Sequence, residues 1–230
     1  MTIQRGPQLP YSVVGGAEFS DAGWVVTSAK MRGSTFSVDS PRTVSTFKEI
    51  LEDRPSFEIL VVNTPLGFMD DESNAVRTCD LETAAILGER DATSRRSVTY
   101  GEIERFSSEN SPRTEVTIAE KVAAEMAPYR QRSIFEGHAE LSFRHLNGDS
   151  TLAFSHDTAA GLDERAALLE KLIPNFPELL VIASRTSPQL AVLNSMAVLW
   201  SARRVFARSA KKLPLIAEWD SRGLRMQIVY

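Results

Sequence analysis

Short apolar segments separated by turn-forming residues occupy the first quarter of the chain. Three of them have strand-like patterns and are joined by connections of a few residues: Tyr11–Gly16, Gly23–Lys30 and Thr35–Asp39. A fourth segment, Phe57–Val62, is continuously apolar, which is typical of a strand buried on both faces. The segment Pro41–Glu52 predicts a helix that Ser40 caps, with Pro41 at the first helical position.

The rest of the chain alternates between helical and strand-like patterns. The sequence predicts helices over Asn74–Leu87, Glu115–Arg130, Asp163–Leu172 and Gln189–Ala210. Strand patterns cover Ile134–Phe143, Leu179–Ala183 and Leu224–Val229. The polar stretch Asp91–Ser111 predicts a long surface connection.

This order of elements predicts an α/β fold built on one mixed sheet. The first three strands follow one another through short turns and therefore pair antiparallel. The fourth is reached through a helix and can run parallel to one of them. Helices would cover the faces of the sheet. A chain of 230 residues can bury such a core as a single domain, which we place at residues 11–230 with a helical or loop insertion around residues 68–131.

Composition and charge indicate which cellular compartment and which partners to expect for this domain. The formal net charge is −4 at pH 7, so an anionic partner would need a local basic patch. A single cysteine, Cys79, excludes an internal disulfide and suits a reducing compartment. No signal-peptide pattern and no stretch apolar enough to span a membrane is present. We therefore expect a cytoplasmic protein without a membrane partner, in an unspecified oligomeric state.

Several short motifs span most of residues 11–230, and they are Gly16–Trp24, Val61–Gly67, Arg77–Asp80, Leu87–Arg90, Glu136–Glu140, Asn194–Ser195 and Gly223–Met226. In this order they resemble the family called domain of unknown function 429, whose members are predicted to be ribonuclease H-like nucleases. The resemblance implies a ribonuclease H-like sheet, with antiparallel strands first and parallel strands after them. It also implies a site for Mg²⁺ or Mn²⁺ and a nucleic-acid substrate.

The chain departs from the family pattern at the positions that the resemblance marks as metal-binding. Glu18 replaces the first Asp, while Asn63 and Asn194 replace two later acids. Ala84 also stands where the family has an Arg, four residues after Asp80. Two-metal cleavage needs two divalent ions held by anionic oxygens about 3.5–4 Å apart. Each Asp-to-Asn change removes a charge whose pairing is worth roughly 4 kcal/mol near the surface at about 4 Å. The carboxylate site is therefore expected to be degraded.

Three further residues are candidates to compensate for the missing acids. Glu136, His138 and Glu140 would share one face if their segment is a strand. They would then offer two carboxylates and an imidazole for one metal ion or for acid–base chemistry. We take Glu18, Glu136 and Glu140 as metal-ligand candidates, and Glu18, Asn63, Glu136, His138, Glu140 and Asn194 as the candidate catalytic set.

Two basic stretches are candidates for binding nucleic acid through its phosphates. One lies on the last predicted helix and includes Arg204, Arg208 and Lys211, and the other includes Arg90, Arg95 and Arg96. Both could equally be solvated surface, since cations favour the C-terminal end of a helix. His145 and His156 have no informative spacing and are expected at the surface.

Three functional interpretations remain open. The first is a nuclease that uses Mg²⁺ or Mn²⁺ and retains weak activity. The second is a catalytically silent binding or regulatory module on the same fold, which needs no metal. The third, a phosphate-handling protein for small molecules, is disfavoured because Gly15–Gly16 lacks the lysine and helix onset of a phosphate loop. Ordinary structural roles, as turn or surface residues, also remain open for Glu18, Asn63 and Asn194.

Overall fold

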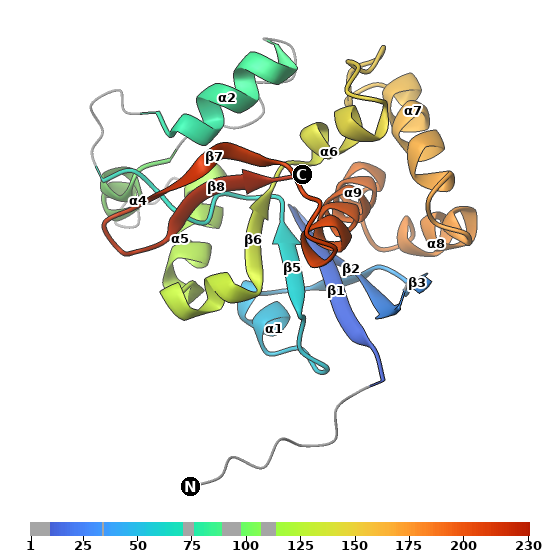
Figure 1. Cartoon of the computed structure of the whole chain (residues 1–230), viewed down its shortest axis with the longest axis horizontal. Helices are drawn as coiled ribbons and strands as arrows, with labels where there is room; N and C mark the ends of the chain where they lie inside the picture. Colours follow the sequence, from blue (N-terminus) through green and yellow to red (C-terminus); the bar gives the residue numbers. More distant parts are fainter. Residues whose placement is uncertain (1–9, 34, 71–75, 89–97, 107–113) are drawn as a thin grey trace, which may run out of the picture.

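The computed structural model describes residues 10–33, 35–70, 76–88, 98–106 and 114–230. Within these residues one sheet of eight strands forms the centre of the molecule (Figure 1). Its strands are β1 (Ser12–Ser20), β2 (Gly23–Arg32), β3 (Thr35–Val38), β4 (Arg42–Val44), β5 (Ile59–Val62), β6 (Ile134–Gly137), β7 (Lys212–Trp219) and β8 (Arg225–Val229).

The strand order is β3-β2-β1-β5-β6-β8-β7, with β4 paired to β2. Strands β1, β2 and β3 pair antiparallel. Strands β1, β5, β6 and β8 then run parallel, and β7 returns antiparallel to β8. The predicted mixed sheet, with antiparallel strands first and parallel strands after them, is confirmed.

Helices cover both faces of this sheet. They are α1 (Phe47–Leu51), α2 (Thr78–Leu87), α4 (Tyr100–Phe106), α5 (Thr114–Glu125), the 3-10 helix η1 (Pro128–Arg132), α6 (Ala139–Leu146), α7 (Ala159–Glu170), α8 (Phe176–Ala183) and α9 (Gln189–Phe206). Helix α9 packs on one face with α6, α7 and α8 around it, while α1 and α5 pack on the other face (Figure 1). None of the helices in the described ranges is long and apolar enough to cross a membrane.

The close packing of α9 on β1 depends on a glycine. A Cβ atom on Gly16 would overlap the carbonyl oxygen of Ser195 and the backbone nitrogen of Leu199. The buried hydroxyls of Thr27 and Ser195 also share a hydrogen bond of 2.7 Å between β2 and α9. Because the two backbones can approach this closely, the first half of α9 is held directly over β1.

The predicted helix over Pro41–Glu52 is wrong in its first half. Arg42–Val44 pairs with β2 as β4, and only Phe47–Leu51 is helical. Thr46, not Ser40, caps this helix through a reciprocal capping box with Glu49. Strand pairing with the sheet thus overrides the local signal for an earlier helix start.

Two predicted strands are also corrected. Ile134–Phe143 is a strand only as far as Gly137, and α6 begins at Ala139. Leu179–Ala183 belongs to α8 rather than to a strand. Leu179–Ala183 is a short apolar run, and the hydrophobic pattern of such a run does not distinguish a helix from a strand. Ile134–Phe143 mixes apolar and polar residues, and the chain changes from strand to helix at His138, the N-cap residue of α6.

The region between β5 and β6 contains more helix than the sequence predicts. Tyr100–Phe106, within the predicted surface connection, forms α4, in which Tyr100 and Ile103 are buried. The rest of that connection, apart from Val98 and Thr99, lies outside the described residues. The predicted helix over Glu115–Arg130 divides into α5 and the 3-10 helix η1.

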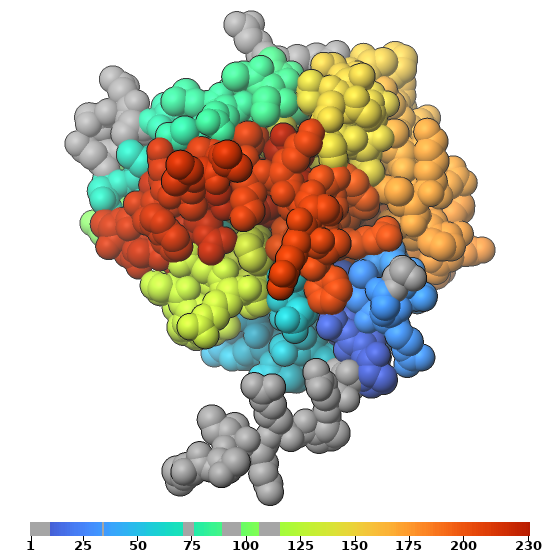
Figure 2. Space-filling model, in the orientation of Figure 1, coloured from blue at the N-terminus to red at the C-terminus, as the bar shows by residue number. Residues whose placement is uncertain are grey.

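At the other end of the chain, β7 and the end of α9 lie on the surface shown in Figure 2.

Candidate functional site

A polar cavity lies at the carboxyl ends of β1, β5 and β6, and we call it the polar pocket. Its volume is about 230 Å³, and its lining residues are Glu18, Asn63, His138, Ala139, Glu140, His156, Leu190 and Asn194. Five of the six candidate catalytic residues therefore meet in one place, and Glu136 is the exception. The carboxyl ends of parallel strands are also where ligands bind in many α/β proteins.

Glu18 and Asn194 approach each other because α9 lies against β1. Glu18 is two residues beyond Gly16 on the same strand face, and Asn194 is in the second turn of α9. The Asn194 amide donates from Nδ2 to Oε1 of Glu18 at 3.3 Å. Its Oδ1 atom is buried and has no hydrogen-bond partner among the described residues. An amide thus contacts the Glu18 carboxylate where the family resemblance implies a second acid.

Asn63 stabilises the start of α6. It follows β5, and its backbone N–H donates to the carbonyl of Ala17 in β1 at 2.8 Å. Its Oδ1 atom accepts a hydrogen bond of 3.0 Å from the backbone N–H of Ala139, the first residue of α6. The first N–H groups of a helix have no partner within the helix, so Asn63 satisfies one of them.

Glu140 lines the polar pocket but is bound by an arginine from α7. Arg165 donates from Nε and Nη2 to the two carboxylate oxygens at 2.9 and 2.6 Å. Its Nη1 atom donates to the carbonyls of Gly161 and Phe154, and the side chain is fully buried. Such a bidentate pair is strong and engages both carboxylate oxygens.

Glu136 points away from the polar pocket, toward the opposite face of β6. Arg77 donates to both of its oxygens at 2.8 and 2.9 Å, and the backbone N–H of Leu66 donates to it at 3.0 Å. The prediction that Glu136, His138 and Glu140 share one strand face is wrong. Glu136 lies in strand β6, whereas His138 is the N-cap of α6 and Glu140 lies inside that helix.

The residues present do not fit a pair of divalent ions. Of the three predicted metal ligands, Glu136 and Glu140 are each bound at both oxygens by a buried arginine. Glu18, the third of them, lines the pocket and accepts a hydrogen bond from the Asn194 amide. Two ions need several anionic oxygens around them.

A second cluster of metal-binding atom types is filled by an arginine. In the part of the chain that the structure describes, one group of three such atoms lies within 4.8 Å, and it comes from Cys79, Asp80 and Glu136. Arg77 donates to both Asp80 and Glu136. Burial by itself would lower the pKa of Arg77, but Coulombic attraction from Glu136 and the hydrogen bond to Asp80 raise that pKa well above its ordinary value. This cluster is therefore a buried ion-pair network.

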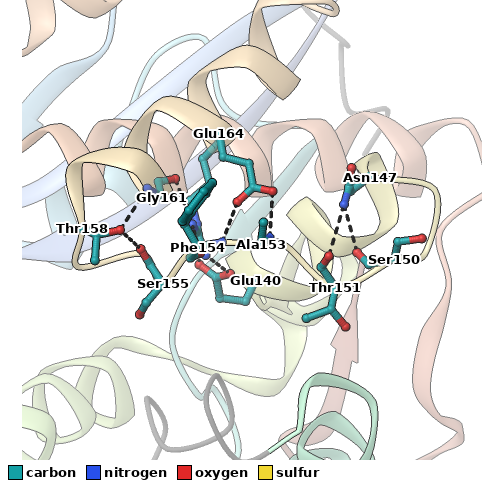
Figure 3. A network of polar contacts seen from close by, with 11 residues as sticks. Glu140, Asn147, Ser150, Thr151, Ala153, Phe154, Ser155, Thr158, Gly161 and Glu164 are labelled. Carbon is teal, nitrogen blue, oxygen red and sulfur yellow. Dashed lines mark hydrogen bonds and ion pairs between the residues drawn. The ribbon is translucent and has the colours of Figure 1, made fainter.

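His156 also lines the polar pocket, although its sequence context predicts a surface role. The loop that carries it is tied to α7, because Glu164 accepts hydrogen bonds from the backbone N–H groups of Ala153 and Phe154 (Figure 3). Thr158 closes the loop by bonding to Ser155 and capping α7 at Gly161. No short-range motif connects His156 with His138, so only the fold brings the two imidazoles to one pocket.

The predicted basic stripe lies far from the polar pocket. Arg204 is ten residues after Asn194 on α9, which is about 15 Å along the helix axis. Its guanidinium packs over the Trp200 ring, and Lys211 forms hydrogen bonds of 3.0 and 3.1 Å with Asp149. Arg208 adopts a left-handed conformation, φ 58°, just after the helix end. Arg90, Arg95 and Arg96 lie outside the described residues.

Comparison with known proteins places this chain in a family. Residues 19–217 match the family described as "Protein of unknown function (DUF429)", and the chain belongs to that family. A search of curated proteins and a search of solved structures each found no match.

Proposed function

We propose that this chain is a ribonuclease H-like relative of metal-dependent nucleases whose carboxylate site is degraded, and that it acts as a catalytically silent binding module. One observation carries the proposal: the three positions that converge from β1, β5 and α9 hold one carboxylate and two amides. An amide offers one weak oxygen and no charge to a divalent ion.

The hydrogen bonds of the two asparagines support this proposal. Asn63 uses its oxygen to accept from the backbone of Ala139, and Asn194 uses its nitrogen to donate to Glu18. These are structural contacts of the protein with itself. The cavity is also lined by Leu190, by the arginine-bound Glu140 and by the imidazoles of His138 and His156. The imidazoles suit hydrogen bonding to a small polar ligand.

A nuclease that retains weak activity is the second candidate. It is favoured by the position of Glu18 beside two imidazoles, since a carboxylate suits the hard ion Mn²⁺ and imidazoles can complete the coordination of a single ion. Nucleic acid as the partner has less support. The cations Arg204 and Lys211 already contact Trp200 and Asp149, and they lie at the far end of α9.

Restoring the lost acids tests the proposal directly. In Asn63→Asp/Asn194→Asp the new carboxylate at position 194 would lie against Glu18, so the metal-free variant should unfold at a lower temperature than the wild type. Mn²⁺ should then raise its melting temperature in proportion to RT ln(1 + [Mn²⁺]/Kd), while the wild type should show no such shift. Asn175→Asp, an exposed site at the start of α8, is the matched control.

Two outcomes would overturn different parts of the proposal. If the restored variant gains no Mn²⁺ affinity, residues 63 and 194 are not former metal positions. If the wild type cleaves single- or double-stranded nucleic acid with Mg²⁺ or Mn²⁺, and Glu18→Ala abolishes that cleavage, the protein is not silent. A gel shift at two salt concentrations completes the test, because phosphate-mediated binding weakens steeply with salt.

A further inference from the structure

A second cavity lies at the opposite ends of the same parallel strands, and we call it the basic pocket. Its volume is about 440 Å³, and it lies between α1, the segment before β5, η1 and the start of β6. This volume is within the range of about 300–1,000 Å³ that is typical of small-molecule sites. The cavity is separate from the polar pocket, with which it shares no lining residue.

The lining of the basic pocket combines an apolar wall with positive charge. Leu60 and Ile134, at the starts of β5 and β6, are nearly completely buried. Phe57 and Tyr129 add aromatic surface, and Tyr129 is itself exposed. Two arginines complete the lining, and no acidic residue belongs to it. An apolar body with one anionic group would therefore match both parts of this surface.

The two arginines of the basic pocket are Arg54 and Arg130. Among the described residues neither forms a salt bridge with a carboxylate. Nη1 of Arg54 donates to the backbone carbonyls of Glu52 and Asp53 at 3.0 and 2.7 Å, which orients its guanidinium. The guanidinium of Arg130 packs over the Tyr129 ring at 5.2 Å. Both guanidinium groups are thus held by uncharged groups, and no carboxylate of the described ranges forms a salt bridge with either.

Arg130 also carries an unsatisfied donor. Its Nε atom is buried and has no hydrogen-bond partner within the described part of the chain. A buried N–H without an acceptor is unfavourable, so structures normally satisfy it with protein, water or a ligand. An anionic oxygen in the pocket would satisfy this donor and compensate the charge at the same time.

From these observations we propose that the basic pocket binds a small amphipathic anion: one carboxylate held by Arg130 and Arg54, with an apolar body against Leu60, Ile134 and Phe57. The body can be aromatic or aliphatic, and two probes distinguish these forms. The probes are 2-naphthoate and octanoate, each compared with its neutral alcohol. The site lies away from the polar pocket and does not depend on the function proposed above.

Calorimetric titration of the full chain with these probes tests the proposal. We expect at least one carboxylate to bind and its neutral alcohol to bind at least about tenfold more weakly, since a charge-assisted hydrogen bond is lost. Arg130→Ala should weaken the carboxylate at least about tenfold. Arg132→Ala is the matched control, because Arg132 is an exposed arginine on the same turn that does not line the pocket. It should change the affinity less than about twofold.

Arg54→Ala provides a second variant should Arg130→Ala fail to fold, because Arg54 is exposed. It should also weaken the carboxylate without changing the affinity for the neutral alcohol. If neither carboxylate binds, if the alcohols bind equally well, or if both arginine variants keep wild-type affinity, the proposal is wrong. Preference for 2-naphthoate over octanoate would indicate an aromatic ligand, and the reverse an aliphatic one.

Discussion

The two cavities lie at opposite ends of β5 and β6 and differ in both charge and polarity. The polar pocket collects two carboxylates, two amides and two imidazoles at the carboxyl ends of the strands. The basic pocket collects apolar side chains and two arginines at the amino ends. One of the two carboxylates, that of Glu140, is paired with Arg165 from another helix.

This difference concerns how far the charges around each cavity are compensated. In the polar pocket Arg165 pairs with Glu140 and Asn63 bonds to Ala139, while Oδ1 of Asn194 has no partner within the described residues. In the basic pocket the charges of Arg54 and Arg130 have no carboxylate partner within the described residues. The following changes test that contrast, beginning with the largest expected effect.

Loss of Arg165 should have the largest effect on the free energy of unfolding. Arg165→Met leaves Glu140 buried without its partner, and breaking one side of a buried ion pair lowers the free energy of unfolding by about 3–5 kcal/mol. The double variant Glu140→Gln/Arg165→Met should recover part of this loss, because the isolated charge is gone. Urea denaturation of the two variants measures the difference. Equal stability of the wild type and Arg165→Met would show that this pair does not hold the pocket wall.

Insertion of a methyl group between β1 and α9 should have the next largest effect on the free energy of unfolding. Gly16→Ala forces the two backbones apart, at a loss of about 1–3 kcal/mol in the free energy of unfolding. It should also disturb the contact between Glu18 and Asn194 while leaving binding at the basic pocket unchanged. Gly33→Asn is the control, because Gly33 has open space around it and Asn tolerates its positive φ. A wild-type denaturation midpoint for Gly16→Ala would contradict the close approach.

Removal of one helix-starting contact beside each cavity allows a matched comparison. Asn63→Ala removes the acceptor for the first N–H of α6, beside the polar pocket. Thr46→Ala removes the capping box of α1, beside the basic pocket. Each should lower the free energy of unfolding by about 1 kcal/mol. Only Thr46→Ala should also weaken carboxylate binding at the basic pocket. If both variants weakened that binding equally, the contrast between the two cavities would be contradicted.

The smallest effect is expected at Asp149, which lines neither cavity. The hydrogen bond from His145, followed by that from Lys211, lowers the pKa of Asp149 from 3.8 to about 2. A carboxyl group whose pKa is lowered by folding stabilises the folded state at any pH above the pKa of the unfolded chain. That contribution is lost as the pH falls from about 4 to about 2. The side chain is 43% exposed, so screening limits the contribution to below about 1 kcal/mol.

Asp149→Asn should therefore reduce stability slightly at pH 7 and progressively less below pH 4. Urea denaturation of this variant and the wild type at pH 7, 4 and 3 measures the difference. A difference that grows toward low pH would have the wrong sign and would exclude this ion pair as its source.

Several elements of the fold could be predicted from local sequence alone. Strands β1, β2, β3, β5 and β8 and the long helix α9 were expected close to their observed positions, because each has a strong pattern bounded by turn-forming residues. Val61 and Val62 are fully buried, as a continuously apolar strand predicts. The positions of Glu18, Asn63 and Asn194 at one cavity were a prediction from family resemblance, and the three residues do line one cavity.

Other elements depended on their surroundings in the folded protein. Ala139–Phe143, which mixes apolar and polar residues, and the apolar run Leu179–Ala183 both lie in helices, although a strand was predicted for each. Arg42–Val44 became a strand because β2 offered it a partner. In each case tertiary contacts decided between two conformations that the local sequence allows about equally.

The sequence by itself determined the mixed α/β architecture and which residue types stand at the candidate positions, since both follow from pattern and order along the chain. Only the tertiary structure decided which charges are compensated. Arg165 reaches Glu140 across 25 residues and Arg77 reaches Glu136 across 59. The electrostatic energy of a charge depends on its distance through space and on its burial, and neither quantity can be read from separation along the chain.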